Sequence, residues 1–166
     1  MIYFIQYGND GPIKIGMVAA ESLNAVGSRL MSLQVSTPIK LKLIGCCSGH
    51  EEEEKKLHKG FRRHRISGEW FNINKKLINL IEDLSEIDQK DKDLFNETIS
   101  PDEFILLFQS EFDIDIYFKT LKNLLMHERN APYYRIFGRR RYKYNECRDY
   151  LLNNGFLEKV EEKHGK

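Results

Sequence analysis

Five side chains in the first sixty residues have types and spacings that could support catalysis. Glu54 and His58 are four residues apart, so they share one face if their segment is helical. A carboxylate binds hard divalent cations, and an imidazole exchanges protons near neutral pH. Tyr3 and Lys14 stand in two short apolar segments around a Gly/Asn/Asp turn, and Arg29 follows in the next segment. Paired strands would let Tyr3 and Lys14 project toward one face.

The hydrophobic pattern predicts the elements that must position these side chains. Two β-forming segments flank the turn at residues 8–11, which is typical of a β-hairpin. The predicted elements are strands over 2–7 and 12–16, a helix over 21–35, a strand over 39–47, a helix over 51–65, a short strand over 69–72 and a helix ending at Leu84. This order predicts an α+β fold, a small mixed sheet with flanking helices, over residues 1–84.

A long motif begins at Glu54 and runs into the short strand. It reads Glu54-x-x-Leu57-His58-x-x-Phe61-x-x-x-Arg65-x-x-Gly68-Glu69-Trp70-Phe71. Together with Tyr3 and the triplet Lys14-Ile15-Gly16, it resembles the GIY-YIG nuclease superfamily, and most of all the branch found in phages, bacteria and fungal meiotically up-regulated proteins. The resemblance covers residues 1–84. It implies a metal-dependent endonuclease that hydrolyses DNA phosphodiester bonds.

The resemblance implies a role for each matched residue. Tyr3 matches the tyrosine of the first family triplet, and Gly16 matches the glycine that lets the backbone pass close to the helix. Arg29 matches the arginine that holds the scissile phosphate. Glu54 matches the single carboxylate that binds the divalent metal, Mg²⁺ or Mn²⁺. Lys14 stands where the wider superfamily has a tyrosine, although lysine is usual in this branch.

Phosphodiester cleavage needs these roles for physical reasons. A divalent metal on Glu54 would polarise a phosphate oxygen and stabilise the departing 3′-oxygen. Arg29 could donate paired hydrogen bonds as negative charge builds on the phosphoryl group. Tyr3, beside a cation, would take a proton from the attacking water, and His58 is the other candidate base or proton shuttle. Arg65 and Gly16 are expected beside the nucleic acid.

Each of these residues also has an ordinary structural interpretation. Glu54 is one of four consecutive glutamates, and such runs are usually solvated. Tyr3 could pack in the core, and Lys14 could be a surface lysine of the hairpin. His58 could make a hydrogen bond on the helix surface, and Glu69 could form an ion pair with Arg65. The departure at Lys14 keeps a second hypothesis open: a catalytically inactive GIY-YIG-fold module that binds nucleic acid or serves in assembly. A third is a structural protein that uses its C-terminal helices as an interface.

The second half of the chain has a different character. Residues 85–98 are polar and are predicted to be a linker or a poorly packed helix end. Residues 99–166 are predicted to be mostly helical, with a helix start at Ser100-Pro101. Strands over 133–137 and 156–160 around a helix over 143–153 would make this region winged-helix-like.

Basic residues are concentrated near the middle of that region. Between residues 129 and 148 there are seven Arg or Lys and one acid, Glu146, with four tyrosines interleaved. This pattern indicates DNA binding through phosphates, with a solvated basic loop as the equally weighted alternative. The predicted contacts are Arg139, Arg140, Arg141 and Lys143. Branched and single-stranded DNA are both candidate partners.

Composition sets outer limits on these hypotheses. The chain has 166 residues and a formal net charge of +1, so any nucleic-acid surface must be local. Three cysteines without Cys-x-x-Cys spacing indicate neither a disulfide framework nor zinc. No stretch has the length of a membrane span, and the start is unlike a signal peptide. A cytoplasmic protein is expected, and its oligomeric state is not predicted.

Overall fold

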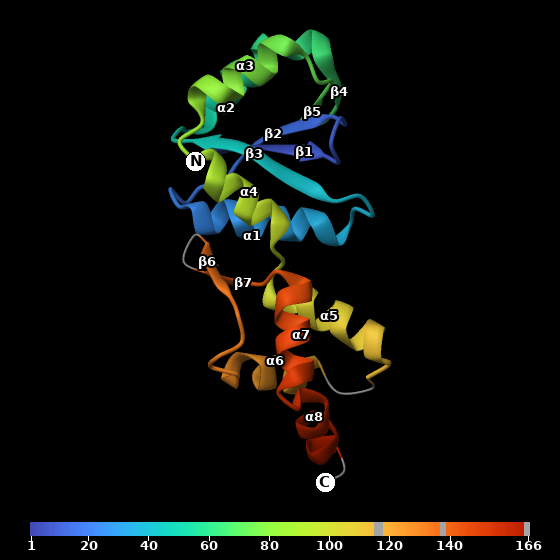
Figure 1. Cartoon of the computed structure of the whole chain (residues 1–166). Coiled ribbons are helices and arrows are strands. Elements are labelled where there is room, and N and C mark those ends of the chain that lie inside the picture. The colour runs from blue at the N-terminus through green and yellow to red at the C-terminus, as the bar shows by residue number, and fades with distance from the viewer. Residues whose placement is uncertain (115–117, 137–138, 165–166) are drawn as a thin grey trace. The chain divides into compact units, whose positions relative to one another are not determined.

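The computed structural model describes residues 1–114, 118–136 and 139–164. The chain divides into two compact units, Met1–Asn96 and Glu97–Lys166 (Figure 1). Each unit has its own hydrophobic core. The α+β class predicted from the sequence is confirmed. No helix in the described ranges is long and apolar enough to cross a membrane.

An antiparallel sheet forms the centre of the first unit. Its strands are β1 (Ile2–Tyr7), β2 (Ile13–Met17), β3 (Leu41–Cys47), β4 (Arg65–Ser67) and β5 (Trp70–Phe71), in the order β3-β1-β2-β5-β4. Each neighbouring pair is antiparallel, so the predicted mixed sheet is wrong. The reason is the path of helix α1 (Leu23–Val35), which carries the chain from β2 past β1 to β3. β2 and β3 run parallel, but β1 lies between them.

Helices cover both faces of this sheet (Figure 1). Helices α2 (Glu51–Gly60) and α3 (Lys75–Leu84) lie on one face, with α1 and α4 (Gln89–Glu97) on the other. The first face buries a cluster that includes Phe4, Ile15 and Phe71 of the strands and Ile81 of α3. Because both faces are covered, nearly all of β1 is buried, and alternation of polar and apolar residues is absent from it.

Two segments of this unit differ from the prediction. The helix predicted over 51–65 ends at Gly60, and the chain continues through a short 3₁₀ turn, Arg62–His64, into β4. The linker predicted over 85–98 contains α4. Phe95 is buried there, and the side-chain amide of Asn96 makes two hydrogen bonds of 3.0 Å to the backbone of Leu43 in β3. A few long-range contacts therefore fix a helix that is polar by composition.

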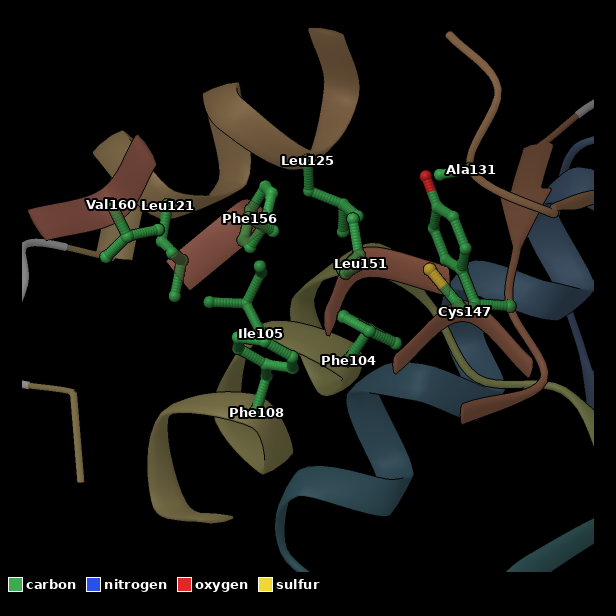
Figure 2. Close-up of a cluster of buried hydrophobic side chains, with 11 residues drawn as sticks. Phe104, Ile105, Phe108, Leu121, Leu125, Ala131, Cys147, Leu151, Phe156 and Val160 are labelled. Carbon is green, nitrogen blue, oxygen red and sulfur yellow. The ribbon is translucent and has the colours of Figure 1, made fainter. Parts of the chain in front are cut away.

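The second unit is a helical cluster with one short hairpin. It contains α5 (Pro101–Phe112), α6 (Phe118–His127), β6 (Tyr134–Ile136), β7 (Arg139–Arg141), α7 (Tyr144–Asn153) and α8 (Phe156–His164). Figure 2 shows its buried core, in which Phe104 and Phe108 of α5 meet Leu125, Leu151 and Phe156 from the other helices. The predicted helix start is confirmed, since Ser100 caps α5.

The predicted strand over 156–160 is wrong, because this segment is α8. Phe156 and Val160 are both buried and four residues apart, which is the helical period. The predicted strand over 133–137 is observed as β6, with residue 137 outside the described ranges. Its hairpin with β7 lies between α6 and α7 rather than after the last helix, so the order differs from the winged-helix-like one expected.

Candidate functional site

Tyr3 and Gly16 form the floor of the candidate site. They are paired in register across β1 and β2. The Tyr3 ring is 1% exposed and lies over the Gly16 backbone. A β-carbon built on Gly16 would lie 2.4 Å from the Tyr3 hydroxyl oxygen and 2.4 Å from Cζ. Only glycine at this position therefore leaves space for the ring.

Arg29 reaches this tyrosine from helix α1. Its neighbours Val26 and Leu30 are buried, while Arg29 itself is exposed. The Nε group donates a hydrogen bond of 3.4 Å to the Tyr3 hydroxyl. This bond, together with charge attraction to Tyr3 and Glu69, raises the pKa of Arg29. The guanidinium thus stays charged beside the phenol.

Lys14 is a buried cation rather than a surface residue. It is 6% exposed, and its ammonium group forms an ion pair with the Glu69 carboxylate. Its Nζ also lies 5.9 Å from the centre of the Trp70 ring, whose strand pairs with that of Lys14. The alternative of a solvated hairpin lysine is wrong, and so is the ion pair between Glu69 and Arg65. Arg65 instead stacks on Phe71, at 5.2 Å from the ring centre.

His58 is oriented by the backbone of β2. Its Nε2 lies 3.0 Å from the carbonyl oxygen of Ile15, and its ring lies 5.3 Å from that of Phe71. A carbonyl oxygen can only accept, so Nε2 must carry the hydrogen of this bond. In the neutral imidazole, Nδ1 is then the nitrogen that can accept a proton.

Glu54 differs from the other acids in its run. Glu51 pairs with Lys55, and Glu53 accepts from the His50 backbone, which lowers the pKa of each carboxyl. Glu52 is exposed. Glu54 is half-buried, and among the described residues its carboxylate has no hydrogen bond or ion pair.

Burial is the main cause that raises the pKa of Glu54. The negative charge of Glu69 raises it further, while His58 and Lys14 act in the opposite direction. Glu54 therefore carries a partly desolvated charge that a cation would stabilise. His58, Glu69 and Lys14 thus lie within electrostatic range of the Glu54 carboxylate.

Glu69 connects the two halves of the site. It pairs with Lys14 and lies within electrostatic range of both Arg29 and Glu54. Through it, Lys14, Arg29 and Glu54 are linked electrostatically, and Arg29 contacts the Tyr3 ring that lies over Gly16. Sequence reasoning did not give Glu69 this position. The sequence alone gives no signal for it, because the position depends on Trp70 pairing with Lys14 across β5 and β2.

The remaining predicted contacts lie elsewhere. Arg65 is exposed on β4 and has no acidic partner in the described residues. In the second unit, Arg141 is 7% exposed and donates to the Thr98 side chain at 2.9 Å, so its prediction as a nucleic-acid contact is wrong. Burial lowers the pKa of Arg141 to about 10. Lys143 forms ion pairs with Glu97 at 3.3 Å and Glu146 at 3.9 Å.

The donor chemistry fits a hard divalent cation. Within the described ranges, no three or more His, Cys, Asp or Glu side chains gather as in a closed metal site. Mg²⁺ needs only one or two carboxylates because it keeps several waters, and Glu54 supplies one. Cys46 and Cys47 do not fit this role. Both are buried in the sheet, and burial raises the pKa of Cys46 to about 12, which disfavours its thiolate.

The chain matches no protein-family model, no curated protein and no solved structure.

Proposed function

We propose that the first unit is a GIY-YIG-type nuclease domain and that the chain is an endonuclease hydrolysing DNA phosphodiester bonds with Mg²⁺ or Mn²⁺. The observation that carries this proposal is the group of side chains beside Gly16. Glu54 is a partly desolvated carboxylate with no hydrogen bond or ion pair in the described residues. It lies within electrostatic range of Glu69, as does Arg29, which contacts Tyr3. A phosphodiester bound there would meet a metal ligand, a guanidinium and a proton acceptor.

Glu54 would hold the metal, which when bound polarises a phosphate oxygen and stabilises the leaving 3′-oxygen. Arg29 binds the phosphoryl group. Its Nε is used on Tyr3, so its two Nη groups remain to donate to two phosphate oxygens. These bonds strengthen as negative charge builds in the transition state.

Two groups can take the proton of the attacking water. Tyr3 accepts a hydrogen bond from Arg29, which orients its hydroxyl group. His58 offers Nδ1, because Nε2 is used on the Ile15 carbonyl. As the general base, Tyr3 is favoured by its contact with Arg29, although it is almost fully buried. His58 is favoured by its better access to solvent, since it is only half-buried. Comparing the Tyr3→Phe and His58→Gln variants decides between them.

Lys14 has a supporting role in this scheme. Its charge is balanced by Glu69, and it lies within electrostatic range of Glu54. The pair therefore ties β2 to the turn before β5, in which Glu69 lies. The same pairing favours the competing function, a GIY-YIG-fold module that binds nucleic acid without cleaving it, because a neutralised lysine stands where the wider superfamily has a tyrosine.

Plasmid cleavage separates the two functions. We expect the full chain to nick supercoiled plasmid in Mg²⁺ or Mn²⁺, and Glu54→Gln to abolish nicking. Glu52→Gln is the matched control, since it makes the same change at an exposed position two residues away on α2. Equal activity of both variants would reject Glu54 as the metal ligand. Plasmid binding without nicking in either metal would establish the inactive module.

A further inference from the structure

The basic residues of the second unit differ in whether an acidic side chain lies within ion-pair distance of them. Lys143 pairs with Glu97, Arg148 pairs with Glu111 and Asp149, and Arg141 is buried on Thr98. Among the described side chains, the lysines and arginines of this unit without an acid within ion-pair distance are Lys119, Arg129, Arg135, Arg139 and Arg140. Three of these five belong to the hairpin of β6 and β7.

The register of the hairpin concentrates its charge. Arg135 stands directly opposite Arg140, and Arg139 stands opposite Ile136 on the next rung of the ladder. Like charges placed directly opposite one another on a strand pair repel and destabilise it. The opposed guanidinium groups of Arg135 and Arg140 therefore cost folding energy in the free protein, and a bound polyanion would remove that cost.

One of the three arginines is already held in place. The Arg140 guanidinium stacks on the Tyr133 ring, at 4.5 Å from its centre, and donates to the Met126 carbonyl at 3.2 Å. A side chain fixed in this way loses less conformational freedom on binding. Arg135, across the same rung, and Arg139, on the next rung, are both exposed.

We infer that Arg135, Arg139 and Arg140, here called the basic hairpin, bind the phosphate backbone of a nucleic acid. Planar guanidinium groups match phosphate geometry with paired hydrogen bonds. Repeated phosphates also match a row of cations better than a single anion does. This surface excludes Arg141 and Lys143, and its binding does not depend on the proposed cleavage.

The test measures DNA binding by the full-length Glu54→Gln chain in EDTA. No cleavage occurs under these conditions, so the result does not depend on whether the nuclease proposal is correct. The probe is a fluorescent 20-base-pair DNA duplex, with its single strand as a second arm, in a series of salt concentrations. We expect Arg135→Gln with Arg139→Gln to lower duplex affinity about tenfold for each arginine replaced. The slope of log affinity against log salt should fall by about 1 for each arginine.

Three features make this result specific. Lys119→Gln removes one exposed charge from α6 of the same unit and should change the slope little. Arg135→Lys keeps the charge and should retain most of the slope. The double variant should unfold at the same or a higher temperature than its parent, because it relieves repulsion.

The duplex and the single strand present the same phosphate groups at different densities. The duplex should bind more tightly than the single strand, since its phosphates are denser. An unchanged slope in the double variant overturns the inference. So does an equal loss in Lys119→Gln, or binding to phosphatidylserine vesicles with no binding to either DNA.

Discussion

Replacing Gly16 with alanine tests how the floor of the site is built. The new β-carbon would lie 2.4 Å from the Tyr3 hydroxyl oxygen, whereas ordinary contact needs about 3.5 Å. The ring must therefore move by about 1 Å. Because Tyr3 is 1% exposed, the surrounding core resists that movement. Overpacking of this kind costs about 1–3 kcal/mol of folding free energy.

The larger effect should be on catalysis. The Tyr3 hydroxyl is 3.4 Å from the Arg29 Nε, so a shift of about 1 Å breaks their hydrogen bond. A misplacement of this size costs about 100-fold in rate. We expect the kcat/KM for plasmid nicking to fall by about that factor, while urea unfolding shows a folded protein.

Gly60→Ala is the matched control, since nothing lies within 4 Å of a β-carbon there. It should keep full activity. If Gly16→Ala is folded and as active as Gly60→Ala, then the packing of Tyr3 on Gly16 has no part in catalysis.

Four further predictions test single residues. Arg29→Lys keeps the charge but loses the planar pair of donors, so kcat should fall about 100-fold or more with little change in KM, and an unchanged kcat would reject phosphate binding by Arg29. Burial raises the pKa of Glu54, so nicking should fail on acidification at a higher pH than for an ordinary glutamate, and added Mg²⁺ should move that limit to lower pH; a limit that does not depend on Mg²⁺ would contradict metal binding by this carboxylate. Because the pKa of Glu54 is raised in the folded state, ionisation of this carboxyl opposes folding. Glu54→Gln should therefore raise the melting temperature at neutral pH. This gain should vanish below the pKa that the Glu54 carboxyl has in the unfolded chain. Arg141→Gln should destabilise the second unit by about 1–3 kcal/mol, because Thr98 loses its buried partner, without changing the salt dependence of DNA binding; a reduced slope would restore Arg141 as a phosphate contact.

Local patterns predicted most elements of the first unit. The apolar segments around the turn at residues 8–11 give the hairpin of β1 and β2, and the helical spacing before Val35 gives α1. Helix α4 was not predicted, because its position depends on Asn96 and Phe95 contacting residues far away in the sequence. The segment after Gly155 was misassigned because five residues with apolar ends fit either a strand or a helix.

The candidate site shows the same division. Glu54 and His58 were placed on one helix face by their spacing alone, and both are half-buried there. The partner of Lys14 was not predicted, since it depends on which strand lies beside β2. The buried position of Arg141 was also missed, because charge type alone indicates a surface residue.

The most direct test is a crystal of the full chain soaked in Mn²⁺, with the metal located by its anomalous scattering. We expect one Mn²⁺ bound to the Glu54 carboxylate, close enough for a phosphate to touch both the ion and Arg29. The Glu54→Gln crystal should lose that peak, and the Glu52→Gln crystal should keep it. A peak at another carboxylate, with none at Glu54, would contradict the proposed nuclease site.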